Sequence, residues 1–186
     1  MELMIRHALI DEKRKTYEWM CLSDTATAHM GGTEFSENPI PNWDEFQEAF
    51  EDSYYTEIGR KSGSVMIINN EDEEIGCTCY ACFHLHEQMA ELDIWLKSES
   101  ECGKGIGTQA LKETIYYLNK DFGINKFLIR PSEKNARAIK SYQKAGFTYR
   151  NDKEDVLRRY YKPECFDIYK GGDYGFENTA VLILEL

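Results

Sequence analysis

The chain has 186 residues, a length that suits one globular domain. Its 33 acidic and 22 basic residues give a net charge of −11, which disfavours nucleic-acid binding and favours cationic small molecules. Hydrophobic residues form 42% of the chain, enough for a packed core. No apolar run approaches the ~20 residues of a membrane span, and the start lacks a secretory-signal pattern. We therefore expect a cytoplasmic protein with no nucleic-acid or membrane partner, whose six cysteines are free thiols.

The first third of the chain is predicted to hold one strand and two helices. Met4–Leu9 alternates weakly between apolar and polar residues, as a strand does, and Asp11 offers an N-cap for the following helix. Ser23–Pro41 is rich in Thr, Gly, Asn and Pro, which indicates a loop or a broken helix. Asn42 with Glu45 three residues later matches a capping box, so a second helix is expected to begin there.

The middle of the chain is predicted to form three strands and then a helix. The strands are Ser64–Asn69, Ile75–His86 and Ala90–Leu96, with short polar turns between them. A polar, glycine-rich stretch follows the third strand. Apolar residues at helical spacing then predict a helix: Ile106, Ala110, Leu111, Thr114, Ile115 and Leu118.

The last third of the chain is predicted to begin with the short buried strand Phe127–Ile129. A helix is expected over Asn135–Ala145 and would be closed by Gly146. Asp152–Asn178 is acidic and aromatic and is expected to be irregular, while Ala180–Leu186 forms a final strand. The order of these elements predicts one α/β domain with a mixed sheet.

The most informative stretch is DIWLKSESECGKGIGT at residues 93–108, where a strand ends and a helix begins. Its glycines, Gly103, Gly105 and Gly107, permit positive φ angles and let main-chain N–H groups approach a ligand. Together with the helix dipole, these groups would form a pyrophosphate site. The spacing matches neither GxxxxGK[ST] nor GxGxxG, which disfavours a P-loop NTPase and a Rossmann dinucleotide site. Taken alone, the stretch could also be an ordinary glycine-rich turn.

A second motif makes the interpretation specific. GKGIGT at residues 103–108, followed by NARAIKSYQKAGF at residues 135–147, resembles the GNAT superfamily of acetyl-CoA-dependent N-acetyltransferases, and within it the aminoglycoside 6′-N-acetyltransferase-like branch. Cys102 stands where this family usually has Gln or Arg. The resemblance covers residues 75–147 well, the N-terminal third loosely, and the tail beyond Asp152 not at all.

The resemblance implies a single GNAT-like domain over residues 1–186. Its α+β fold would have a mixed, mostly antiparallel central sheet, a V-shaped splay between two central strands and about four flanking helices. Acceptor-side helices would lie at about 11–52, the acetyl-CoA-binding core at about 75–147, and a C-terminal acceptor loop and strand at about 152–186. Acetyl-CoA would bind in the splay, without a metal, against Ile94, Trp95, Leu96, Cys102, Gly103, Lys104, Gly105, Ile106, Gly107, Thr108 and Asn135.

Two residues are candidates for the acid–base chemistry that acyl transfer to an amine requires. The resemblance makes Tyr142 the general acid that protonates the departing thiolate; otherwise it is a core tyrosine. Asp93 is the favoured base, because it is acidic within a largely apolar strand and would hold the substrate ammonium. Two alternatives stay open: Glu91, on the same face two residues earlier, could be the base, or Asp93 could pair with a nearby cation as a structural residue.

One position departs from the antibiotic-modifying branch. Where those enzymes usually have Asp-Pro, this chain has Arg130-Pro131. A cation there would repel a polyamine substrate, or would recruit a carboxylate or phosphate group on the substrate. The acceptor pocket is expected to come from residues 19–50 and 152–178, which hold carboxylates and aromatic rings suited to an amine: Asp24, Glu34, Glu37, Asp44, Glu45, Glu48, Asp155, Asp167, Asp173, Trp19, Trp43, Tyr160, Tyr161 and Tyr169.

The cysteine and histidine pairs do not indicate a metal site. Cys79 and Cys82 would lie on opposite faces of one strand, and no second pair stands at zinc spacing in the sequence. His84 and His86 are expected on a partly exposed face of that strand.

We therefore expect an acyltransferase that moves an acetyl group from acetyl-CoA to a primary amine of a small molecule, aminoglycoside-like or polyamine-like, by direct attack in a ternary complex. The alternatives are a protein N-terminal or lysine acetyltransferase and a non-catalytic acyl-CoA-binding sensor. The expected partners are acetyl-CoA and the amine acceptor. The sequence leaves the oligomeric state open, with a homodimer as one alternative.

Overall fold

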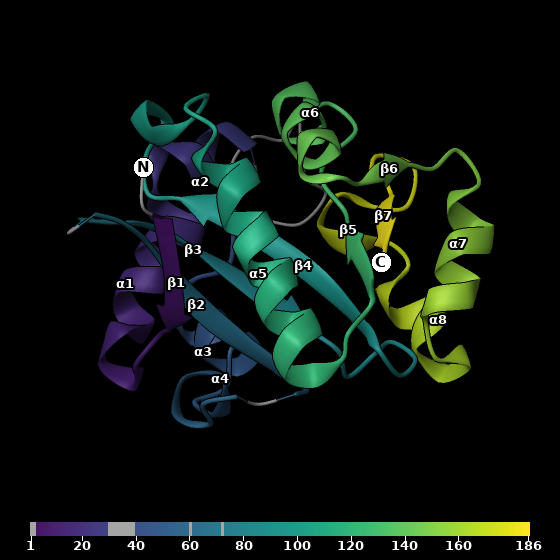
Figure 1. Ribbon diagram of the computed structural model, residues 1–186, viewed down its shortest axis with the longest axis horizontal. Coiled ribbons are helices and arrows are strands. Elements are labelled where there is room, and N and C mark those ends of the chain that lie inside the picture. The colour runs from purple at the N-terminus through teal and green to yellow at the C-terminus, as the bar shows by residue number, and fades with distance from the viewer. Residues whose placement is uncertain (1–2, 30–39, 60, 72) are drawn as a thin grey trace.

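Seven strands form one sheet in the computed structural model, which describes residues 3–29, 40–59, 61–71 and 73–186 (Figure 1). The strands lie side by side in the order β1-β2-β3-β4-β5-β7-β6. Within the described residues, β4 and β5 are the one parallel pair, and the other neighbours are antiparallel. The bounds are β1 Leu3–His7, β2 Gly63–Asn70, β3 Glu73–Ala81, β4 Met89–Leu96, β5 Lys126–Ile129, β6 Thr148–Tyr149 and β7 Leu182–Glu185.

The parallel pair separates halfway along β4. Pairing with β5 runs from Met89, opposite Lys126, to Leu92, opposite Ile129, where β5 ends. β4 continues for four more residues, 93–96, which pair only with β3 on the other side. The expected splay between two central strands and the mixed, mostly antiparallel sheet are therefore confirmed, and residues 93–96 present a main-chain edge without a strand partner.

Two helices cover one face of the sheet. The long helix α5 (Ile106–Phe122) lies across the near face in Figure 1, with α6 (Ala136–Ala145) beside its N-terminal end. Both helices bury apolar side chains against β4, β5 and β7, because the face that meets the sheet is apolar. That packing fixes the start of α5 and the whole of α6 next to the point where β4 and β5 separate.

The opposite face carries the N-terminal helices. They are α1 (Lys13–Tyr17), continued by a π-helical turn (Glu18–Leu22), and then α2 (Asp24–His29), α3 (Trp43–Ala49) and α4 (Ser53–Thr56). Side chains from these helices pack on β2 and β3 around Tyr17, Phe46, Tyr55, Val65 and Ile67. The capping box predicted for α3 is present: the Asn42 side chain accepts from Glu45 N, and Glu45 accepts from Asn42 N.

The segment 152–178 differs from its expected irregular structure. It forms two helices, α7 (Lys153–Tyr160) and α8 (Pro163–Tyr169), and the 3-10 turn η4 (Gly172–Tyr174). Both helices are short, and their few apolar side chains pack on residues of β5 and β7 rather than on each other alone. Tertiary packing therefore stabilises helices that the local pattern did not indicate. They lie to one side of the sheet in Figure 1.

Two smaller expectations are corrected. The strand predicted to reach His86 ends at Ala81, and the chain then turns through residues 82–88, with Gln88 at a φ of 62°. Asp11 does not cap the first helix; the Glu12 side chain instead accepts from the main-chain N–H of Leu9. The stretch 23–41, expected to be a loop or a broken helix, begins with the short helix α2, and its residues 30–39 lie outside the described structure. No helix in the described part of the chain is long and apolar enough to cross a membrane.

Candidate active site

A cleft of about 550 Å³ opens where β4 and β5 separate. Its walls come from the free end of β4, the glycine loop before α5, the exposed side of α6 and the turn η4. The glycine loop closely follows β4 in the sequence, whereas α6 and η4 come much later in the chain, yet all four elements border the same cleft. The cleft therefore joins a main-chain edge, a helix N-terminus and several titratable side chains.

The glycine loop has the backbone geometry expected for a phosphate site. Gly103 and Gly105 have φ angles of 76° and 86°, in the left-handed region that side chains other than glycine rarely adopt. A Cβ atom at either position would meet open space, so the main chain is uncovered there. Gly105 is also the N-cap of α5, whose first N–H groups lack intrahelical partners and carry the positive end of the helix dipole.

The structure brings the predicted coenzyme residues together, with one exception. The side chain of Ile106 is only 2% exposed and packs into the core with Ile75 and Leu96, so it does not border the cleft. The other predicted residues border the cleft: Ile94, Trp95, Leu96, Cys102, Gly103, Lys104, Gly105, Gly107, Thr108 and Asn135.

Asn135 also has a structural role, because its side-chain oxygen caps the N-terminus of α6 by accepting a hydrogen bond from Ala138 N at 3.0 Å. One contact between the two motifs joins the hydroxyls of Thr108 and Ser141 at 2.9 Å, which holds α5 against α6. The sequence reasoning missed three cations of α6 that border the cleft, Arg137, Lys140 and Lys144. Their positions within the second motif, residues 135–147, are the sequence feature that could have indicated a place at the cleft.

Asp93 and Tyr142 lie in the same cleft. The Asp93 carboxylate accepts from the main-chain N–H of Ile94 at 3.2 Å. Burial raises the pKa of Asp93 well above its ordinary value, and the negative charges of Asp173 and Glu91 add to the rise. Burial, together with the charge of Asp93, likewise raises the pKa of Tyr142, so its hydroxyl keeps its proton at neutral pH. The pair thus offers one proton acceptor and one proton donor.

Glu91, the alternative base, is held by other side chains. Its carboxylate accepts from Arg130 Nε at 2.6 Å, from His84 Nε2 at 2.6 Å and from the Tyr161 hydroxyl at 3.3 Å. Although burial opposes ionisation, these partners lower its pKa to about 2. An ionised carboxylate with three donors is a poor proton acceptor, and this favours Asp93 over Glu91 as the base.

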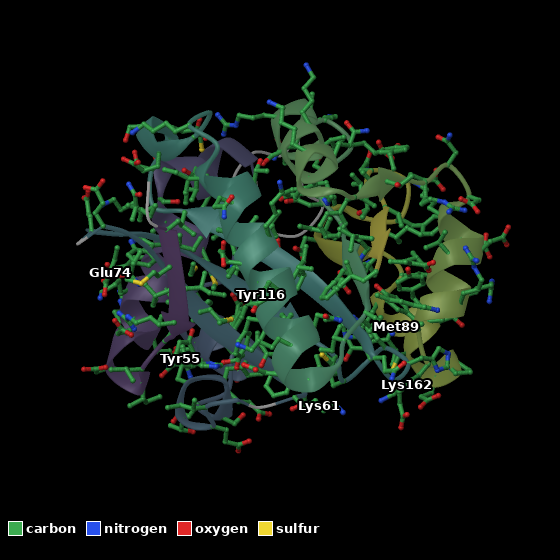
Figure 2. All side chains as sticks on the ribbon, viewed as in Figure 1. Tyr55, Lys61, Glu74, Met89, Tyr116 and Lys162 are labelled. Atoms are coloured by element: carbon green, nitrogen blue, oxygen red, sulfur yellow. The ribbon has the colours of Figure 1, made fainter. Side chains whose placement is uncertain are left out.

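A smaller cavity of about 160 Å³ adjoins the cleft and shares Asp93, Arg130 and Asp173 with it. Phe83 and Tyr169 stand in its wall at a ring distance of 5.6 Å, and both remain partly exposed. The turn with Phe83 is tied to the start of α8, because Lys162, labelled in Figure 2, donates to the Phe83 carbonyl at 2.6 Å.

The acceptor segments contribute unequally to these cavities. Tyr169 and Asp173 border the smaller cavity, whereas Tyr160, at the end of α7, and Tyr161 are buried in the core, from which the Tyr161 hydroxyl reaches Glu91. Trp43 packs against other aromatic rings of the N-terminal helices. Among the remaining expected acceptor residues, Glu34 and Glu37 lie outside the described residues.

In the part of the chain that the structure describes, the thiols and histidines form no metal-binding group. The six cysteines are unpaired, and the described residues contain no cluster of three potential metal ligands. The expected exposed pair of histidines is corrected, since His84 and His86 follow the end of β3 and only His86 is exposed. His84 is buried and borders the smaller cavity instead.

Comparison with known proteins agrees with this geometry. A family model for the acetyltransferase (GNAT) domain matches residues 2–148, so the chain belongs to the GNAT acetyltransferase family. Among curated proteins, it is 39% identical over 56 residues to aminoglycoside N(6′)-acetyltransferase type 1 of Klebsiella pneumoniae. That match spans 30% of this chain and 28% of the relative, less than a third of its length.

Solved structures match over the whole chain. The complex of AAC(6′)-Ib with ribostamycin and coenzyme A has a TM-score of 0.69 at 20% identity, covering 100% of this chain and 94% of that one. Spermidine N-acetyltransferase from Vibrio cholerae, with CoA and spermine, has a TM-score of 0.65 at 14% identity, covering 98% of this chain and 95% of that one. At these identities the similarity shows the fold.

Proposed function

We propose that this chain is an acyltransferase that moves an acetyl group from acetyl-CoA to a primary amine of a small molecule. One observation carries the proposal: Asp93 and Tyr142 lie in a cleft formed by the free edge of β4 and the glycine loop. An unpaired strand edge is a template for an extended ligand with amide groups. A left-handed glycine loop at a helix N-terminus suits a diphosphate.

The residues of this chain supply binding and proton transfer in the proposed reaction. When bound, acetyl-CoA supplies an acetyl thioester with an activated carbonyl. Asp93 would hold the incoming ammonium and accept its proton at a carboxylate oxygen, and burial, which raises its pKa above the ordinary value, makes it a stronger base than an exposed carboxylate. The Tyr142 hydroxyl would donate a proton to the leaving sulfur as the new amide forms.

The acceptor is proposed to be a compact amine, aminoglycoside-like or polyamine-like. The cavities beside Asp93 contain a second carboxylate, Asp173, and the aromatic rings of Phe83 and Tyr169. Carboxylates and aromatic faces both attract ammonium groups. Aminoglycosides and spermine are also the acceptor-side ligands named in the complexes of the structural neighbours.

A panel of amines tests this function. Release of free thiol from acetyl-CoA should be measured with kanamycin, spermidine, amino acids and short peptides. Acetylation of at least one small amine, lost in Asp93→Asn and Tyr142→Phe while both variants still bind acetyl-CoA, is the expected result. Activity on peptides alone would overturn the small-molecule acceptor, and acetyl-CoA binding without transfer to any amine would favour the sensor.

A further inference from the structure

Arg130 follows β5 directly and borders both cavities. Its side chain is only 9% exposed, yet it carries a full charge. Nε donates to Glu91 Oε1 at 2.6 Å, and Nη1 donates to the main-chain carbonyl of Tyr169 at 2.8 Å. One guanidinium therefore joins the end of β5, the middle of β4 and the chain leaving α8.

The turn after α8 closes tightly on this side chain. A Cβ atom at Gly172 would lie 3.1 Å from Arg130 Nη1, and Gly172 has a left-handed φ of 58°. The guanidinium carbon also lies 5.5 Å from the centre of the Tyr161 ring. Asp173 is the next residue after Gly172. The contact between Gly172 and Arg130 therefore helps to determine where the Asp173 carboxylate lies in the site.

We propose that Arg130 is a positioning and specificity-determining residue of the acceptor site, a role that rests on the proposed amine acetylation. Through the Tyr169 carbonyl it holds the turn that places Asp173 beside Asp93. Its ion pair with Glu91 neutralises the negative charge of Glu91, which is the third carboxylate beside Asp93 and Asp173. The site then accommodates the ammonium that reacts, and Arg130 weakens, without preventing, the binding of a second ammonium group of the acceptor in the smaller cavity.

The charges around the site support this assignment. Glu91 is ionised, with its pKa lowered to about 2, and Arg130 is its counter-ion. Other titratable groups lie near Asp93 and Asp173 among the described residues: Cys79, His84, Tyr142, Tyr161, Tyr169 and Tyr174. The same cleft is also bordered by Cys102 and Lys104 of the glycine loop and by Arg137, Lys140 and Lys144 of α6. Burial raises the pKa of the Cys79 thiol and of the Tyr142, Tyr161 and Tyr174 hydroxyls, which stay neutral, while His84 donates Nε2–H to Glu91. Removing Arg130 alone therefore adds one uncompensated negative charge.

A titration that needs no acceptor tests the charge assignment. The carboxyl carbons of Asp93 and Asp173 should be followed by carbon-13 NMR against pH in wild type, Arg130→Met, Arg130→Lys and the double variant Glu91→Gln with Arg130→Met. In Arg130→Met we expect an upward shift of about one pH unit or more in at least one of the two carboxyls. Arg130→Lys keeps the charge, and the double variant removes both charges, so each should shift less than half as much. No shift in Arg130→Met overturns the proposal.

Kinetics test the specificity. Phenethylamine, with one positive charge, and spermidine, with several, serve as the two acceptors. Arg130→Met should raise the ratio of kcat/KM for spermidine to that for phenethylamine at least fivefold, and the double variant should return it to within twofold of wild type. Arg130→Lys should keep the ratio but raise KM for phenethylamine with kcat unchanged, because Lys lacks the fork that also reaches Tyr169. A ratio that Arg130→Met leaves unchanged overturns the proposal.

The two measurements separate failure of this proposal from failure of the proposed function. If the wild type acetylates neither amine nor any other in the panel, the proposed function fails, and the NMR titration still tests Arg130. If amines are acetylated while the titration and the ratio stay unchanged in Arg130→Met, only the role of Arg130 fails. Should Arg130→Met not fold, the double variant, which leaves no unpaired charge, is compared with Glu91→Gln in both measurements.

Discussion

The proposed coenzyme side and the proposed acceptor side of the cleft are built in different ways. The coenzyme side uses main chain: the free edge of β4 at residues 93–96 and the glycine loop that follows within a few residues. The acceptor side uses side chains from distant segments, among them Phe83, Arg130 and Asp173. A main-chain site is set by local backbone geometry, whereas a side-chain site depends on how the fold packs. Changes on the two sides should therefore affect different measurements.

The largest effect is expected at the reacting centre, between the two sides. Tyr142→Phe removes the hydroxyl that we assign as proton donor, so kcat should fall by ~10²-fold or more while the Kd for acetyl-CoA stays within about twofold. Steady-state thiol release and calorimetric titration measure the two quantities. Tyr149→Phe is the control, because that hydroxyl donates to Glu133 outside the cleft. An unchanged kcat in Tyr142→Phe would remove the tyrosine from the mechanism.

A change in the glycine loop should weaken coenzyme binding. Gly105→Ala puts a Cβ on a residue with a φ of 86°, which costs about 1–2 kcal/mol of backbone strain, and the methyl group projects into open space above the loop. We expect the Kd for acetyl-CoA to rise about tenfold. Gly123→Ala is the matched control: its φ is 67°, it has equal free space, and it ends the same helix at the far side. Equal changes in Kd for both variants would count against a diphosphate site.

A change in the aromatic wall should affect the acceptor alone. Phe83→Ala removes one ring beside the smaller cavity, and loss of a cation–π or apolar contact of about 1 kcal/mol should raise KM for the amine about fivefold. KM for acetyl-CoA should stay constant in the same assay. Tyr116→Ala is the control, since Figure 2 shows this residue on α5 and its side chain is 63% exposed outside both cavities. A higher KM for acetyl-CoA in Phe83→Ala would contradict the assignment of Phe83 to the acceptor side alone.

The smallest effect concerns stability. Because the pKa of Asp93 is higher in the folded state than in the unfolded chain, the folded state binds this proton more tightly. Stability is therefore lost as pH rises from about 4 towards the raised pKa. Asp93→Asn removes this loss, so its Tm at pH 8 should exceed that of the wild type by about 2–4 °C, and the difference should shrink towards pH 4. A lower Tm for Asp93→Asn at pH 8 would contradict the cause assigned to the shift.

The sequence predicts the coenzyme side well, because its signals are local. The glycines of the loop, the Asn135 cap and the strand over residues 90–96 each depend on neighbours within a few positions, and the structure has them where they were expected. Ile106 was expected both in the loop motif and on the apolar face of the helix, and the structure buries its side chain in the core as the helical spacing predicts. A motif defines main-chain positions better than side-chain directions.

The acceptor side could not be predicted to the same degree. Glu91 and Arg130 are 39 positions apart, and nothing in the local pattern indicates that they form an ion pair. The helices α7 and α8 are too short to be stable alone and depend on their contact with β5 and β7. The place of Asp173 in the cleft follows from those contacts, so reasoning from the sequence could name the carboxylate without knowing what it faces.

Four residue pairs between β4 and β5 join the two halves of the sheet. Strands β1–β4 form one half and β5–β7 the other, and the angle between the two halves fixes how wide the cleft opens. Leu92 and Phe127 are buried within this short seam, under α5. A substitution that changes the side-chain volume at these four pairs would rotate one half of the sheet relative to the other. A small rotation there becomes a larger displacement at the open end of the cleft, where acetyl-CoA and the amine must meet.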